Sequence, residues 1–91
     1  MADLHKYNRF YLSYSGIRLP LKLVGPLEPS EIENRNTFFA SKEDDQGRVT
    51  EIAKVVYNEI GLHHHYRYHD DDQSLVEAVI TTDGETHTIQ Y

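Results

Sequence analysis

Apolar and polar residues alternate at every second position in two segments near the start of the chain, residues 10–14 and 17–23. This period of two is typical of a half-buried β-strand. Ser15 and Gly16 lie between the segments and predict a two-residue hairpin turn, because glycine adopts a positive φ without strain. Pro20 cannot donate a hydrogen bond, so we expect the second strand at a sheet edge or a bulge. The alternating apolar residues are Phe10, Leu12, Tyr14, Ile17, Leu19, Leu21 and Leu23.

The following segment, residues 25–36, holds two of the three prolines and lacks the period of a strand. This composition predicts a connection between strands. Pro29 suits the first turn of a helix, and the acidic residues after it would lie near the positive end of the helix. We therefore expect a short helix that runs through Asn34.

Beyond residue 36 the chain alternates five strand-like runs with short turns rich in Asp, Asn and Gly. Such short connections join neighbouring strands as antiparallel hairpins, because a parallel crossover needs about a dozen residues or more. The pattern predicts a mainly β fold: a single twisted antiparallel meander sheet of about six or seven short strands, with one short helical or irregular connection. The twist could also curl this sheet toward a half-barrel. The five runs are residues 37–42, 48–57, 62–69, 75–82 and 86–91.

Length and composition favour a single β-rich domain over residues 1–91. The chain has 91 residues, too few for a second hydrophobic core, and 38% of them are hydrophobic. It has no cysteine, which excludes disulfides, thiolate metal sites and cysteine nucleophiles. No apolar stretch is long enough to span a bilayer, and the N-terminus lacks the apolar region of a signal peptide. We therefore expect a cytoplasmic protein that does not bind membranes.

Charge is distributed unevenly along the chain, whose net charge is -6. The first 42 residues carry four acids and six bases, whereas residues 43–91 carry eleven acids and three bases. An acidic protein repels phosphates and anionic lipids, so we expect no nucleic-acid partner. The basic strands could pack beside the acidic ones, or one of the two halves could form a charged surface for a partner.

A histidine-rich stretch, His63–Asp72, is the strongest candidate for a binding site. On a strand, His63, His65 and His69 share one face, and the His-x-His spacing suits two ligands of one Zn²⁺, Cu²⁺ or Ni²⁺ ion. Arg67 lies between two of these histidines, and its permanent positive charge disfavours a bound dication. A metal site is therefore one of two interpretations of this stretch.

The second interpretation of the stretch is structural. A turn over residues 70–73 would place His64 and two tyrosines opposite aliphatic residues of the next strand. Another turn, over residues 58–61, would place Lys54 opposite His65. His64 would then be a half-buried histidine whose pKa affects stability. The expected cross-strand pairs are Tyr68 with Val76, Arg67 with Glu77, Tyr66 with Ala78 and His64 with Ile80.

Catalytic signatures are missing from the chain. It contains no nucleophile elbow, phosphate-binding loop, dinucleotide-binding glycine pattern or His-Glu-x-x-His motif. Ser13 and Ser15 have no histidine or acid beside them in the sequence, and they are typical of a turn. We therefore expect a protein that is not an enzyme and has no cofactor.

Two parts of the chain resemble known families. Residues 44–50, Asp-Asp-Gln-Gly-Arg-Val-Thr, and residues 66–70, Tyr-Arg-Tyr-His-Asp, resemble the YD repeat of Rhs-type bacterial proteins. The resemblance spans residues 43–91 and departs from the repeat at Glu43, where the repeat has tyrosine. It implies successive antiparallel strands and no activity. Residues 11–21 are similar to the start of small uncharacterised bacterial proteins, and this similarity implies no function.

Together these patterns predict a small cytoplasmic bacterial accessory protein, a protein-binding module without catalytic activity. Both faces of residues 48–57 are partly apolar, so a second layer must cover each face. Leu27 and Ile32 are the only large apolar residues of the predicted connection and would cover one face incompletely. We therefore expect a protein partner or a symmetric homodimer. The alternative is a metal-binding protein that uses the histidines of residues 63–69.

Overall fold

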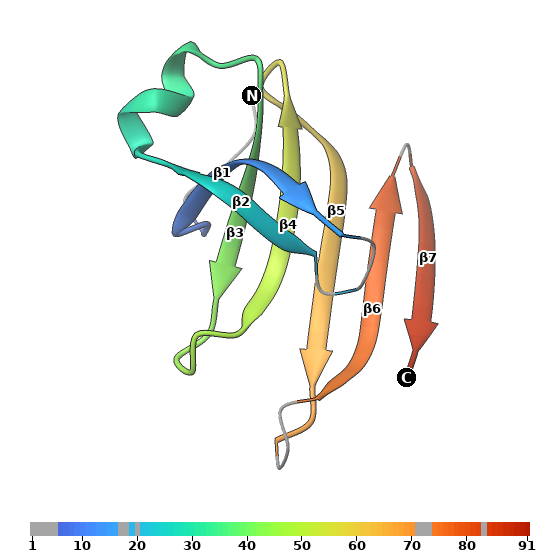
Figure 1. Ribbon diagram of the computed structural model, residues 1–91. Coiled ribbons are helices and arrows are strands. Elements are labelled where there is room, and N and C mark those ends of the chain that lie inside the picture. Colours follow the sequence, from blue (N-terminus) through green and yellow to red (C-terminus); the bar gives the residue numbers. More distant parts are fainter. Residues whose placement is uncertain (1–5, 17–18, 20, 71–73, 83) are drawn as a thin grey trace.

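The computed structural model describes residues 6–16, 19, 21–70, 74–82 and 84–91. Strands account for most of this part of the chain, with one short 3-10 helix, η1, between the second and third strands (Figure 1). In the described residues, no helix has the length and apolar character needed to cross a bilayer. The elements are β1 (Arg9–Ser15), β2 (Lys22–Leu27), η1 (Pro29–Asn34), β3 (Thr37–Glu43), β4 (Val49–Val56), β5 (Glu59–Tyr68), β6 (Leu75–Thr82) and β7 (Glu85–Gln90).

The seven strands form one antiparallel sheet with the order β2-β1-β3-β4-β5-β6-β7, and this sheet is open. The predicted fold class is therefore confirmed, as are the consecutive hairpins from β3 to β7. The start of the chain departs from a simple meander, because β1 and not β2 pairs with β3. The connection that contains η1 carries the chain past β1, and β2 becomes one edge of the sheet (Figure 1).

The connection between β1 and β2 is longer than predicted. Ser15 pairs with Lys22, so residues 16–21 form the connection and the predicted two-residue turn is wrong. Leu19 and Leu21 lie in this connection and pack against the core. These leucines alternate because they are buried, although they lie outside the strands. A period of two in the sequence does not show whether buried residues belong to a strand or to a loop. The expectations for Ile17, Arg18 and Pro20 fall on positions outside the described residues.

β2 continues through Leu27, into the segment predicted as a connection. Gly25 permits this path, since its φ is 72° and a Cβ atom at this position would lie 2.8 Å from the Cβ atom of Leu12. Pro26 is compatible with β2 because the strand is an edge and one of its sides needs no ladder donors. The short helix follows as predicted, and it takes the form of a 3-10 helix.

The hairpin of β1 and β2 lies across one face of β3, β4 and β5 (Figure 1). The backbone N–H of Leu21 donates a hydrogen bond of 3.2 Å to the hydroxyl of Tyr66, which joins the hairpin to the middle of β5. The sheet thus covers one of its own faces with its first two strands. The core on this face consists of Phe39, Ile52, Tyr66 and Ala78, and it is packed by Tyr11, Leu19, Leu21 and Leu23, among others.

The opposite face is covered over part of β3 and β4 by residues that precede β1, of which residues 6–8 are described. Tyr7 is buried against alanines of β3 and β4, and Phe10 packs beside it. Leu27 and Ile32, which the sequence suggested as a cover, are each partly buried. The N-terminal segment therefore supplies a cover that the pattern of the connection did not indicate.

Two β-bulges change the predicted strand registers. The β5–β6 pairs are confirmed except at Tyr68, which lies opposite Leu75 because the register shifts after Arg67. The β4–β5 hairpin turns at Tyr57 and Asn58, whose φ angles of 48° and 67° are typical of a type I′ turn. This turn and a bulge after Lys54 alter the pairing in that hairpin. The confirmed pairs are Arg67 with Glu77, Tyr66 with Ala78 and His64 with Ile80.

Candidate functional site

His63 and His65 lie on the same face of β5, as their spacing predicts. Glu51 of β4, and not Lys54 as expected, lies opposite His65. The Oε2 atom of Glu51 is 3.9 Å from Nε2 of His63 and 3.1 Å from Nζ of Lys6. The two histidines therefore lie beside a partly buried carboxylate that already has a lysine as its ion-pair partner.

The electrostatics of this group favour a neutral imidazole. Burial lowers the pKa of His63 below its usual value near 6.5, and the charge of Glu51 opposes this shift only in part. Lys6 and His65 lower this pKa further. Burial also raises the pKa of Tyr7, which lies next to the same lysine. At neutral pH the ion pair is therefore between Glu51 and Lys6, and the neutral His63 is not suited to act as a general acid.

His69 lies apart from the other two histidines proposed as metal ligands. It follows the end of β5, where its backbone N–H donates to the carbonyl of Ser74 at 2.8 Å and its carbonyl accepts from Arg48 at 3.4 Å. Asp70 is exposed, and residues 71–73 lie outside the described part of the chain. Among the described residues, no group of three or more His, Cys, Asp or Glu side chains could hold a metal ion.

His64 points to the opposite face, into the core. Its Nδ1 atom is 2.6 Å from the hydroxyl of Tyr66, which also accepts a hydrogen bond from the backbone of Leu21. Burial lowers the pKa of His64, with a smaller contribution from His63, and burial raises the pKa of Tyr66 to about 12. The Tyr66 hydroxyl therefore stays protonated, and it donates a hydrogen bond to the neutral imidazole of His64. This network joins the hairpin to β5 and is structural.

The turn between β3 and β4, which carries the first part of the YD-repeat resemblance, holds a self-contained network. The carboxylate of Asp44 accepts hydrogen bonds from the backbone N–H groups of Gln46 and Arg48, both at 2.9 Å, and from the Arg48 side chain at 2.7 Å. These bonds lower the pKa of Asp44. The Arg48 guanidinium also lies over the ring of Tyr68 at 5.2 Å. These contacts fix the turn, and they leave no charged group of this network without a partner.

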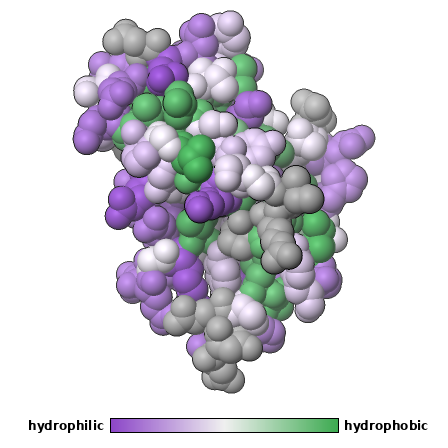
Figure 2. Space-filling view, in the orientation of Figure 1, coloured by the Kyte–Doolittle hydropathy of each residue, from purple (hydrophilic) through white to green (hydrophobic). Residues whose placement is uncertain are grey.

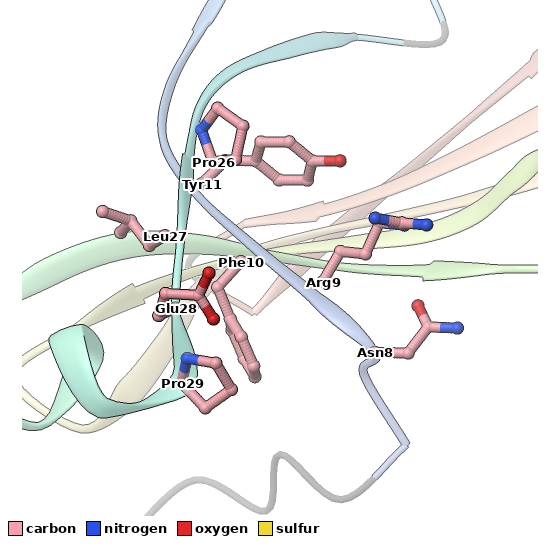
Figure 3. A pocket seen from close by; sticks show the side chains of 8 residues that line it. All are labelled: Asn8, Arg9, Phe10, Tyr11, Pro26, Leu27, Glu28 and Pro29. Atoms are coloured by element: carbon pink, nitrogen blue, oxygen red, sulfur yellow. The ribbon is translucent and has the colours of Figure 1, made fainter.

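A pocket of about 230 Å³ lies beside the paired ends of β1 and β2, and Figure 3 shows its lining. Its charged side chains have partners elsewhere: Arg9 is 3.2 Å from Glu43, and Glu28 takes part in the capping box of η1. The rest of the wall combines the polar side chains of Asn8 and Tyr11 with four apolar residues. The two charged side chains already take part in contacts of the fold, so neither is reserved for a ligand. The lining residues are Asn8, Arg9, Phe10, Tyr11, Pro26, Leu27, Glu28 and Pro29.

The two edges of the sheet differ in how readily they could pair with another strand. β2 contains a glycine with positive φ and a proline, both of which weaken a regular ladder. β7 contains neither, and all six of its residues are exposed. In the described part of the chain, no strand pairs with the outer side of β7, which borders the sheet in Figure 1. The edge at β7 is thus available for strand pairing.

Hydrogen bonding between β6 and β7 identifies the backbone groups on this free edge. The N–H of Tyr91 donates to the carbonyl of Val76 at 2.9 Å. Opposite residues in an antiparallel pair alternate between bonded and non-bonded positions, so the odd-numbered residues of β7 bond to β6. The N–H and C=O groups of Thr86, Thr88 and Gln90 therefore point outward. We call these three residues the outer row of β7.

Apolar side chains on the face seen in Figure 2 reach the surface in small patches separated by hydrophilic ones. Near the free edge, Ile89 and Tyr91 are 38% and 62% exposed. Side chains of β6 and β7 also bond to each other. The Oγ1 atoms of Thr81 and Thr86 are 3.3 Å apart, and Nε2 of Gln90 donates a hydrogen bond of 2.6 Å to Oε2 of Glu77. The free edge therefore combines unpaired backbone groups with a few exposed apolar side chains.

Sequence reasoning missed both the Lys6–Glu51 ion pair and the free edge. Lys6 and Glu51 are far apart in the chain, and no local pattern indicates their contact. The run of residues 86–91 was recognised as a strand, but its position at the edge depends on the order of strands in the sheet. The available signal was its composition, since it lacks the Pro, Gly and Lys that commonly protect edge strands.

Residues 3–91 match the model of a Family of unknown function (DUF6156). No curated protein and no solved structure matches the chain. The match agrees with the resemblance to small uncharacterised proteins, and nothing in the comparisons supports the YD-repeat resemblance.

Proposed function

The chain belongs to this family of unknown function, and we propose that the protein is a small protein-binding module that takes up an extended strand along the outer edge of β7. The observation that carries the proposal is the outer row of β7, whose backbone groups point away from β6 on a strand whose six residues are all exposed. In β-strand addition, main-chain hydrogen bonds to such a row supply affinity, and alternate side chains supply specificity.

The lack of protection at β7 supports this proposal. Exposed edges risk unwanted pairing, so proteins usually blunt them with charge, proline, bulges or covering segments. β2 follows this rule with Gly25 and Pro26, whereas β7 has a regular register with β6 along its whole length and only one acidic residue, Glu85. An unprotected edge opposite a protected one is expected where strand pairing is useful to the protein.

The proposed module has no catalytic activity. Glu51 is ion-paired with Lys6, and Asp44 with Arg48, so these carboxylates serve the fold. We place this module in the bacterial cytoplasm, and the similarity of residues 11–21 to small bacterial proteins supports a bacterial source. The YD-repeat resemblance of residues 43–91 implies successive strands and turns, and it implies no activity.

Selection from a displayed library of random peptides tests the proposal. Peptides selected on the wild-type protein are retested on Thr88→Pro, which removes an outward N–H that β6 does not use, and on Thr88→Val, which keeps it. We expect binding to persist in Thr88→Val and to weaken by about tenfold in Thr88→Pro, the loss of roughly one hydrogen bond. Failure to select peptides, or equal binding to both variants, would contradict strand addition at β7.

A metal-binding function is the second candidate, favoured only by the position of Glu51 beside His63 and opposite His65. Lys6 competes with a metal ion for the same carboxylate. Titration with Zn²⁺, followed by imidazole NMR signals, tests this alternative. A saturable one-to-one complex that His65→Gln abolishes and His69→Gln preserves would support it, and the absence of a saturable shift would exclude it.

A further inference from the structure

The outer row of β7 is symmetric about Thr88, and this symmetry identifies an occupant for the edge. Resting on the proposed function, we infer that the strand added to β7 is β7 of a second copy of this chain, antiparallel to the first, with Thr88 opposite Thr88. A two-fold axis through this pair makes the interface isologous, which is the commonest symmetry of homodimers. The two sheets become one continuous sheet.

Backbone geometry selects this register. A new antiparallel ladder can form only between residues whose backbone groups point outward, which are Thr86, Thr88 and Gln90 on each copy. With Thr88 at the centre, Thr86 lies opposite Gln90 of the second copy, and all members of the outer row have partners. Three hydrogen-bonded pairs with two bonds each give about six backbone hydrogen bonds.

Neighbouring registers that preserve the two-fold symmetry are less complete. A shift that centres the axis on His87 places Gln90 opposite Gly84, which lies in the turn, and brings His87 against its own copy. A shift that centres the axis on Ile89 places Thr86 beyond the end of β7 of the second copy, because the strand ends at Gln90. The register about Thr88 is therefore the one that pairs the whole outer row.

Side chains opposite each other in this register are compatible on both faces. One face brings Thr88 against Thr88 and Thr86 against Gln90, and threonine pairs and hydroxyl–amide contacts are favourable across strands. The other face brings His87 against Ile89 of the second copy and Glu85 against Tyr91 of the second copy. Like charges do not meet directly, and the exposed Ile89 and Tyr91 each gain a neighbour.

The size and charge of the contact indicate a weak dimer. One edge strand from each copy buries less than the roughly 1,600 Å² of a standard interface, so we expect association across about 10 µM to 1 mM. Residues 43–91 carry eleven acids and three bases, so the two copies repel each other over long range. Salt screens this repulsion, and the dimer should strengthen when NaCl is raised from about 50 to 500 mM.

Sedimentation equilibrium tests whether the dimer forms and whether it uses β7. We expect the wild type and Thr88→Val to dimerise in this concentration range. The dimer dissociation constant of Thr88→Pro should rise about a hundredfold, because the two-fold axis removes the outward Thr88 donor from both copies. A wild-type mass that stays at 10.6 kDa up to 1 mM would overturn the inference. If the wild-type protein still selected peptides whose binding Thr88→Pro weakens, the proposed function would stand without the dimer. A dimer equally stable in Thr88→Pro would overturn the inference, whereas the proposed function would fall only if the selected peptides also bound Thr88→Pro and Thr88→Val equally.

Cross-linking tests the register, because the chain has no cysteine of its own. Thr88→Cys places two thiols on residues about 5.5 Å apart at Cα, within the range that a disulfide spans. Thr86→Cys is the matched control, since its thiols would be four residues out of register and about 13 Å apart. Under mild oxidation we expect Thr88→Cys to form covalent dimer at least about tenfold faster. Equal rates for the two variants would overturn the register.

Discussion

Replacing Tyr66 with phenylalanine tests the hydrogen-bond network that joins the first hairpin to the sheet. The side chain is only 1% exposed, and phenylalanine fills nearly the same volume, so the change removes the hydroxyl without opening a cavity. Two groups then lose their partner: the backbone N–H of Leu21 and the Nδ1 atom of His64. The expected effect is therefore due to unsatisfied polar groups.

The magnitude of this loss follows from burial. His64 is 5% exposed, so its Nδ1 atom loses its donor in a site largely closed to water. A buried polar group left without a partner costs about 1–3 kcal/mol, and the Leu21 N–H is only partly buried and can recover some hydration. We expect the free energy of unfolding of Tyr66→Phe to fall by about 2 kcal/mol.

Equilibrium urea denaturation at pH 8, where His64 is neutral, measures this loss. Tyr57→Phe is the matched control, because the Tyr57 side chain is 70% exposed and the same substitution there should change the free energy of unfolding by less than about 0.5 kcal/mol. A loss in Tyr66→Phe no larger than that of the control would refute the network as a link between hairpin and sheet.

Three further predictions concern pH, charge and backbone geometry. Burial lowers the pKa of His64 in the folded protein, so unfolding takes up a proton at acidic pH. The free energy of unfolding should therefore be constant above about pH 6.5 and fall below it. Between pH 8 and 5.5, the urea midpoint should drop less in His64→Asn than in the wild type. Arg67→Ala and Glu77→Ala should couple by about 0.2–0.5 kcal/mol in a double-mutant cycle, because Arg67 Nε and Glu77 Oε1 are 3.7 Å apart and the Arg67 side chain is exposed to solvent. Strict additivity would contradict the contact. Gly25→Ala should lower the melting temperature more than Gly47→Ala, since both have positive φ but only the first places its Cβ against a neighbour.

The histidine stretch shows how far local pattern reached toward the candidate site. Alternation placed His63 and His65 on one face and His64 on the other, as the structure has them, because the side-chain period of a strand is a local property. The predicted neighbour of His65 was wrong, since a bulge and the position of the turn shift the register by several residues. The pairing of Glu51 with Lys6 brings together distant parts of the chain, and alternation contains no information about it.

The sequence by itself determined the strands from β3 to β7 and the type of connection between them. Alternation and turn residues act within a few positions, so the backbone has little choice once they are present. Tertiary structure decided that β1 inserts between β2 and β3, that the hairpin covers one face, and that β7 is left as a free edge. These features depend on which apolar faces meet after the strands have formed. Leu19 and Leu21 illustrate this difference. Both are apolar and pack against the core, although neither lies in a strand.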